Sequence, residues 1–570
     1  MPGREALLVI FKKLNHKRIA CHESYTERCA SCKKNPKMID WIKKILNNEE
    51  SKEILEWETD DSILRHLKAN LNEDGSLNES AEKLPDEKKA DDEIKFAPGL
   101  MDAMFGADES EESKSRIKQL VSLIKRVTKN GDNQSKSDFY REITENESVI
   151  GIIDEFLQSL GKSSLPIEPD LFGFANKLAT KTNNRNSVKF GIAILGLCQN
   201  KKPIDDIKIL GLHDEFTVFS TVALSNLSDN LVKDLWELAK QVDGWGKIQL
   251  VDRLAEMKLN SEIKDWLVFD GYKNNIMYEY LALTCAQNGM LNEKLKTEKI
   301  DDKLYSSASD IIVALMDEGP AIGMSGYDDS SETIENFIKH SKKRNLNISN
   351  YITLHRIKDY LEESPEENET LKNWNQNDLS NCLIDINELL NSKDWRTEVQ
   401  IALKSSDNVE YWNGKQAAQK LGIDLWDTVW QKLKQNPLDS SAWYDVTANA
   451  KENNVDETID FAINNLPLDF LGSGPKDSAG IGEDYQKHSS LDSVITFLEN
   501  YPKKGEKLIL VGLDSPVTRN RNMSLRTLQS WTSSNWNEEI RTKLNELKEI
   551  EPNADTKSDL VKLLNGEKIE

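Results

Sequence analysis

The sequence of 570 residues lacks several features that whole classes of protein require. No apolar run approaches the roughly 18 to 20 residues that cross a bilayer, so no membrane span is expected. The early apolar run at residues 6–11 is also shorter than the apolar region of a secretory signal. Lys and Arg are outnumbered, 74 against 97 Asp and Glu, and the net charge of −23 would repel a phosphate backbone. These shortages predict a cytoplasmic protein that does not bind nucleic acid.

Cysteine is also scarce. Six cysteines in a chain of this length are too scattered for a disulfide framework and are expected to be reduced thiols. Cys198 lies within an apolar helical stretch and is interpreted as a small core residue.

The sequence also lacks the common nucleotide-binding motifs. No P-loop pattern occurs, and neither glycine pair of the glycine-rich stretch at residues 471–483 is completed, because Asp477 and Tyr485 stand where the third glycine of Gly-x-Gly-x-x-Gly would be. Tyr411 and Lys415 have the Tyr-x-x-x-Lys spacing of short-chain dehydrogenases, which chance explains equally well in a chain rich in lysine. His213 is interpreted as a turn or cap residue. No motif therefore names a reaction.

The first 37 residues differ in composition from the rest of the chain. They carry nine Lys and Arg against three Glu, or +6, which leaves −29 for the remainder. One interpretation is a basic upstream extension that is absent from the working protein, with Met38 as the start. The alternative is a zinc site formed by Cys21, Cys29 and Cys32 with a neighbouring histidine, His16 or His22, because Cys-x-x-Cys places two thiolates on one tight turn. The second pair of ligands lacks a standard spacing.

A repeated pattern is the strongest positive signal. Between residues 188 and 316 an apolar stripe with helical spacing returns about every 30 residues. Its central residue is alanine in four cases and arginine in one, and a polar stretch with turn residues precedes each stripe. The stripes lie at residues 187–197, 216–227, 248–257, 277–286 and 308–317, and their centres step by 30, 30, 29 and 32 residues at Ala193, Ala223, Arg253, Ala282 and Ala314. Such a period predicts an all-α fold, a HEAT-like α-solenoid of stacked helix pairs.

Composition divides the remaining chain around these repeats. The prediction has five parts: the basic extension at 1–37, a helical segment with a solvated charged linker at 38–112, the HEAT-like repeats at 113–318, a Trp-rich helical block at 332–464, and a C-terminal repeat with its cap at 465–570. Trp426 and Trp430 are four residues apart and share a helix face. They either line the bottom of an apolar groove that binds a ligand or fill the space at a junction between helices.

Several segments resemble a known family when they are taken together. DLFGFANKLATKTNNRNSVKFGIAILGL, LGLHDEFTVFSTVALSNLSD, VDGWGKIQLVDRLAEMKL, GYKNNIMYEYLAL, LVGLDSPVTRNRNMSLRTLQSW and EPNADTKSDLVKLL are similar to HEAT-like repeat proteins of bacilli and related Gram-positive bacteria. The resemblance covers residues 38–564. Members of that family are often called limonene hydroxylase. The resemblance therefore implies hydroxylation of a cyclic monoterpene, NAD-linked oxidation of the resulting carveol or perillyl alcohol, and use of NAD(P)H, without a catalytic motif that can be assigned to residues here.

Two functions thus remain open. The resemblance implies an oxidoreductase, a limonene monooxygenase with monoterpene alcohol dehydrogenase activity, whose small apolar terpene could lie near Trp426 and Trp430. The residues alone favour a non-catalytic helical-repeat scaffold that binds a protein or peptide along its concave face.

Overall fold

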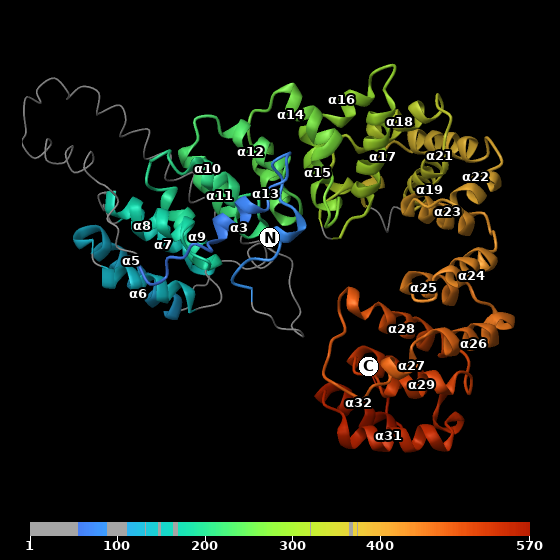
Figure 1. Cartoon of the computed structure of the whole chain (residues 1–570). Coiled ribbons are helices and arrows are strands. Elements are labelled where there is room, and N and C mark those ends of the chain that lie inside the picture. Colours follow the sequence, from blue (N-terminus) through green and yellow to red (C-terminus); the bar gives the residue numbers. More distant parts are fainter. Residues whose placement is uncertain are drawn as a thin grey trace, which may run out of the picture. The chain divides into compact units, whose positions relative to one another are not determined.

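The computed structural model describes residues 55–87, 111–131, 133–145, 150–162, 169–319, 321–363, 369–372 and 374–569 (Figure 1). These residues form α-helices joined by turns and short 3-10 or π segments, and they contain no strand beyond two isolated bridges. The prediction of an all-α chain is confirmed for them. Among the described helices, none combines the length and the apolar character needed to cross a bilayer.

The described chain divides into two compact units. Unit 1 contains the residues up to Lys343 together with Tyr360–Leu383, and unit 2 contains Arg344–Asp359 and the residues from Ile384 onward. The boundary thus falls inside the predicted Trp-rich block at 332–464. The five-part division predicted from composition stays a prediction, and its first part lies outside the described residues.

Unit 1 is built from short helices connected by tight turns. Its helices are α3 (Ile63–Ala69), α5 (Glu111–Asn130), α6 (Asn133–Thr144), α7 (Ile150–Lys162), α8 (Pro169–Thr180), α9 (Arg185–Leu195), α10 (Ile204–Leu210), α11 (Asp214–Leu227), α12 (Leu231–Ala239), α13 (Gly244–Ala255), α14 (Ser261–Trp266), α15 (Glu279–Asn288), α16 (Leu291–Leu295), α17 (Asp302–Met316), α18 (Ser330–Ser341) and α20 (Glu369–Lys372). The shorter segments are η1 (Glu79–Ala81), the π segment η2 (Leu267–Gly271) and η3 (Met324–Gly326).

Unit 2 has the same character. The boundary between the units runs through α19 (Ile348–Leu361) and α21 (Gln376–Leu390). The helices that follow are α22 (Arg396–Ala402), α23 (Asn408–Lys420), α24 (Trp426–Gln435), α25 (Ser440–Asn449), α26 (Val455–Asn465), α27 (Leu468–Leu471), α28 (Gln486–Leu498), α29 (Glu506–Leu513), α30 (Thr518–Trp531), α31 (Glu538–Ile550) and α32 (Ala554–Leu564), with 3-10 segments η4 (Glu452–Asn454), η5 (Glu483–Tyr485) and η6 (Ser533–Asn535).

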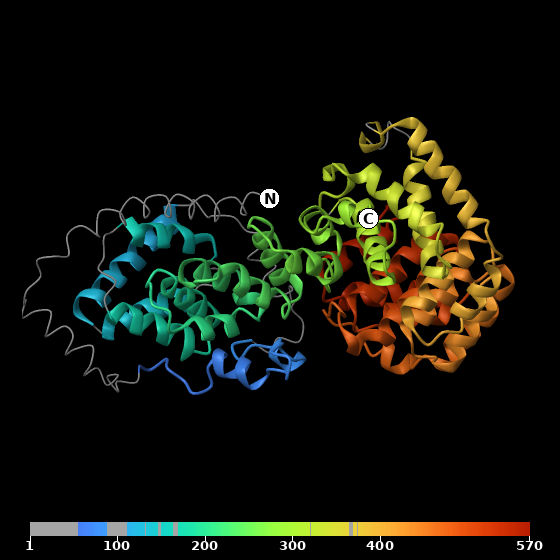
Figure 2. The same cartoon turned by 90° about the horizontal axis from the view of Figure 1, so that it is seen from above.

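The five predicted stripes lie in five helices that pack in succession. They fall in α9, α11, α13, α15 and α17, and each of these helices contacts the next one. Helices α10 and α12 pack beside α11 and α13 as a second row. Figure 1 shows α10, α12, α14 and α16 along one edge of unit 1, with α11, α13, α15 and α17 beneath them, and the same succession can be followed in the green helices of Figure 2.

The polar stretches before the stripes supply helix caps. The side chains of Asn184, Asp243 and Asp301 accept backbone N–H groups at the starts of α9, α13 and α17. His213 does the same for α11, where its Nδ1 accepts from the N–H of Glu215 at 3.2 Å. The first backbone N–H groups of a helix have no partner within the helix, so these side chains fix where four of the five stripes begin. Helix α15, which holds the remaining stripe, begins after Tyr278 without a side-chain cap.

The solvated linker predicted at residues 73–93 is wrong for residues 73–87, and residues 88–93 lie outside the described part of the chain. Residues 73–87 contain the 3-10 turn η1, and Ala81 and Leu84 are buried in the core of unit 1. Asp86 accepts hydrogen bonds from the backbone N–H and the guanidinium of Arg185, at 2.7 Å and 3.0 Å respectively. The stretch is therefore attached to unit 1 by two apolar anchors in its core and by one ion pair to Arg185 of α9.

Candidate functional site

The candidate zinc ligands cannot be placed. Cys21, Cys29 and Cys32, with His16 and His22, lie outside the described residues, and that site stays a prediction. Within the part of the chain that the structure describes, no group of three or more His, Cys, Asp or Glu side chains is arranged to hold a metal ion.

Trp426 and Trp430 lie together on α24, as their spacing predicts. Their rings stack with centroids 5.1 Å apart, and Trp430 packs edge-on against Phe461 of α26 at 5.0 Å. Trp443 of α25, which is fully buried, also packs against Phe461, with ring centroids 5.8 Å apart. These rings fill the junction of three helices. The apolar groove for a terpene stays a prediction.

Tyr411 and Lys415 lie close together on α23, but a third residue changes their chemistry. Asp445 of α25 pairs with the Lys415 ammonium and accepts a hydrogen bond from the Tyr411 hydroxyl at 3.4 Å. Burial and the charge of Asp445 raise the pKa of Tyr411 to about 12. A tyrosine that transfers protons beside a lysine requires a lowered pKa. The arrangement therefore does not fit a dehydrogenase pair.

The glycine-rich stretch at 471–483 does not fit the dinucleotide that the resemblance implies. The N–H of Gly474 donates to the carbonyl oxygen of Asp514 at 2.8 Å, and Gly480 packs so closely on Val517 that no Cβ would fit. The stretch leads into η5 without a preceding strand. Its glycines thus serve packing, whereas a nucleotide fold uses them to admit a pyrophosphate.

Two further interpretations from the sequence are confirmed. His213 caps α11, and burial lowers its pKa. Cys198 is buried at the end of the first repeat helix, its thiol donates to the carbonyl oxygen of Ile194, and burial raises its pKa to about 12. Neither group is prepared for nucleophilic or acid–base chemistry, because a reactive thiol requires a lowered pKa and solvent access.

A polar cluster that the sequence analysis missed joins α28 to α30. His488 Nδ1 lies 2.7 Å from Asn520 Oδ1, and the hydroxyl of Ser515 donates to the same oxygen at 2.8 Å. The residues resemble the parts of a nucleophilic site, but Ser515 is 0% exposed and His488 is 1% exposed. A substrate could not reach them, and their hydrogen bonds hold the two helices in register.

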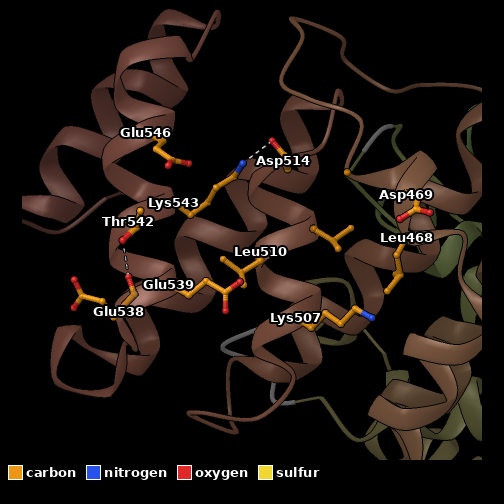
Figure 3. Close-up of a pocket in the computed structure, with 12 residues that line it drawn as sticks. Leu468, Asp469, Lys507, Leu510, Asp514, Glu538, Glu539, Thr542, Lys543 and Glu546 are labelled. Carbon is orange, nitrogen blue, oxygen red and sulfur yellow. Dashed lines mark hydrogen bonds and ion pairs between the residues drawn. The ribbon is translucent and has the colours of Figure 1, made fainter.

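A cleft lies on α27, α29 and α31 in unit 2. Its volume is about 620 Å³, within the range of roughly 300 to 1,000 Å³ that ligand pockets occupy. Figure 3 shows α29 in the middle, with side chains of α31 and α27 on either side of it. The lining residues are Leu468, Asp469, Gly472, Lys507, Leu510, Val511, Asp514, Glu538, Glu539, Thr542, Lys543 and Glu546.

Two side-chain bonds connect the walls that α29 and α31 form in this cleft. At one end Asn537, the N-cap of α31, donates to Glu506 of α29 at 2.8 Å. At the other end Lys543 Nζ of α31 lies 2.7 Å from Oδ1 of Asp514, the C-cap of α29, and Figure 3 shows the Lys543 side chain spanning the gap. The cleft is thus a built part of the helix packing.

The cleft combines an apolar floor with an acidic rim. Leu468, Leu510 and Val511 supply aliphatic surface, and all three are half-buried. Five carboxylates line the cleft against two lysines, and one of these lysines, Lys543, is already paired with Asp514. A ligand that fits would therefore present positive charge around an apolar group.

Comparison with known proteins does not assign this chain. No protein-family model matches the sequence, and no curated protein matches it. The helix packing and the cleft are therefore the features that bear on function.

Proposed function

We propose that the protein is a HEAT-like α-solenoid that acts as a binding scaffold for another protein. The observation that carries the proposal is a set of side-chain bonds that connect residues about one repeat apart. Arg185 pairs with Glu215, which lies 30 positions further on, and Asn274 donates to the carbonyl oxygen of Gly244, 30 positions earlier. Each of these bonds connects one helix pair to the next, as in a stack of repeats.

The same separation returns in unit 2. Lys415 pairs with Asp445 across 30 positions, and the Asn520 side chain donates to the carbonyl oxygen of His488 across 32. Helices α28, α30 and α32 pack in succession, with α29 and α31 as a second row. These bonds support a repeat of about 30 residues in unit 2 as well, where the sequence pattern is weaker.

An architecture of this kind supports binding without requiring chemistry. Its helices contact mainly their neighbours, so the outer faces of each row remain available over a long surface. The cleft on α27, α29 and α31 belongs to one of these rows. The grouping of a concave apolar floor with polar groups around it is typical of a binding site.

The resemblance implies a different kind of function, that of an enzyme, the limonene hydroxylase. Its support is the resemblance alone, since the Tyr411–Lys415 pair and the glycine-rich stretch do not fit the groups that it would use. No reaction step is assigned to any residue.

The test uses the full chain, immobilised and exposed to a library of displayed peptides. We expect saturable binding by an enriched set of peptides, with hydrogen-exchange protection on the exposed faces of successive helices. The same preparation is assayed for limonene oxidation with NAD(P)H and oxygen. Enrichment of no peptide, together with turnover in proportion to the protein, would overturn the scaffold in favour of the enzyme.

A further inference from the structure

We propose that the cleft on α27, α29 and α31 binds a lysine- or arginine-rich segment of a partner protein that carries an apolar anchor residue. This proposal rests on the proposed scaffold function and names the chemistry of the partner at one site. It is argued from the floor of the cleft, from the sign of its charge and from the spacing of its carboxylates.

The floor selects an aliphatic side chain. Leu468 of α27 and the pair Leu510 and Val511 of α29 are half-buried, so each keeps part of its surface open to the cleft. Covering such surface is favourable, because it removes apolar area from water. One or two aliphatic side chains of a partner would bury it.

The rim selects positive charge. Asp469, Asp514, Glu538, Glu539 and Glu546 come from three different helices and converge on one cavity. With Lys543 already paired with Asp514, Lys507 is the other cation that lines the cleft, and Figure 3 shows it reaching from α29 towards α27. An acidic partner would meet like charges on most sides, whereas a basic one would meet opposite charges.

The spacing of the carboxylates favours a peptide with several basic side chains over a single ion. On α31, Glu538 and Glu546 are eight positions apart, which corresponds to about 12 Å along the helix axis. No group of three or more His, Cys, Asp or Glu side chains in the described part of the chain is arranged to hold a metal ion. Successive lysine or arginine side chains on a peptide can pair with carboxylates at this spacing.

Part of this acidic character has an ordinary structural role. Glu538 and Glu539 lie in the first turn of α31, where negative charge stabilises the helix dipole. Glu546 lies in the middle of α31, is exposed and lines the cleft. Glu549 is exposed on the same helix but does not line the cleft. Glu546 and Glu549 therefore make a matched pair for a test.

The experiment measures binding of a fluorescein-labelled peptide of lysines and leucines, in amphipathic helical spacing, to the full chain by fluorescence anisotropy. We expect saturable binding that weakens as salt is raised, since exposed charges are screened. Glu546→Gln should weaken the affinity about threefold, the size expected for one exposed ion pair, and Glu549→Gln should leave it nearly unchanged. Lys507→Glu should tighten binding, because it removes a like charge and adds an opposite one.

A second probe tests the anchor. A peptide with serine in place of leucine should bind several-fold more weakly, and Leu510→Ala should remove most of that difference. Equal binding of the two peptides, or of spermine at the same affinity as the leucine peptide, would show a site for small cations only and would overturn the proposal. Equal losses in Glu546→Gln and Glu549→Gln would overturn it as well.

The outcome for the cleft is distinguishable from the outcome for the scaffold. If displayed peptides bind the chain but protect helices other than α27, α29 and α31, the cleft proposal is wrong and the scaffold function stands. If no peptide binds at any surface, both are wrong.

Discussion

Arg521 of α30 and Glu551, which follows α31, form an ion pair with no exposure to solvent. The guanidinium donates to the two carboxylate oxygens at 2.6 Å and 2.8 Å, and both side chains are 0% exposed. The third nitrogen of Arg521 donates to the carbonyl oxygen of Ser515 at 2.8 Å. The two residues are 30 positions apart and thus join one helix pair of unit 2 to the next.

Removing one member of this pair should destabilise unit 2 strongly. Glu551→Ala leaves a buried guanidinium without its counter-ion, and we expect a loss of about 3 to 5 kcal/mol in the free energy of unfolding. Urea denaturation measures this loss when the unfolding of unit 2 is monitored by hydrogen exchange of the amides in α30 and α32. Lys504→Gln, which breaks the partly exposed pair with Asp456, should cost less than about 1 kcal/mol. Similar losses in the two variants would contradict this account.

Gly244 should be far less replaceable than a glycine with the same backbone conformation elsewhere. Gly244 begins α13 with φ of +66°, and a Cβ there would overlap a carboxylate oxygen of Asp214. Gly422 has φ of +64° but open space around the Cβ position. We expect Gly422→Ala to cost about 1 to 2 kcal/mol from the left-handed conformation alone, and Gly244→Ala about 1 to 3 kcal/mol more. Thermal denaturation of both variants checks the difference, and equal costs would show that Asp214 moves aside freely.

The stability of unit 1 should fall as the pH rises through the weakly acidic range. Burial raises the pKa of Asp214 to about 7, well above its value in the unfolded chain. The folded state therefore holds a proton that the unfolded state has released. The contribution of this group is complete below about pH 4 and falls by up to about 1.4 kcal/mol per pH unit until pH 7.

Asp214→Asn tests this pH dependence, because the amide keeps an oxygen that can accept from the N–H of Gly246. The variant should have a flatter stability curve between pH 4 and 7, measured by urea denaturation at several pH values. Asp154 provides a comparison, since burial raises its pKa to about 6. The effect of Asp154→Asn should therefore end near pH 6. Curves for Asp214→Asn that run parallel to the wild type would show that the carboxyl is ionised throughout.

The helices of unit 1 could be predicted from sequence because their apolar residues recur with a helical period. The stripe centred on Ala223, for example, lies in α11, and the polar residue before it, His213, is the cap. The charged stretch at 73–87 was predicted wrongly for a physical reason. Its two anchors, Ala81 and Leu84, stand among acidic residues, and the partner of Asp86 is 99 positions away. No local pattern carries such a contact.

The cleft could not be predicted for a related reason. Its carboxylates are spread from Asp469 to Glu546 over three helices, and each one alone is typical of an exposed helix face. The packing of α27 and α31 on α29 brings these segments together, and the bonds of Asn537 to Glu506 and of Lys543 to Asp514 add to it. The sequence could show that the C-terminal helices are acidic, but not that their charges surround an apolar floor.

Tyr411 should remain protonated well above the pH at which an exposed tyrosine ionises. Burial and Asp445 raise its pKa to about 12, and Lys432 Nζ lies 3.7 Å from the centre of its ring. Tyrosinate absorbance is measured in the wild type and in Tyr411→Phe, and the difference between them reports Tyr411. This difference should show no ionisation up to about pH 10.5. Circular dichroism at each pH confirms that the protein is still folded. Asp445→Asn removes a negative charge beside the hydroxyl and leaves the Lys415 ammonium without its counter-ion. That variant should lower the pKa of Tyr411. Ionisation of Tyr411 between pH 7 and 9 in the wild type would contradict this assignment, because it would mean that Lys415 activates the tyrosine, as a dehydrogenase requires.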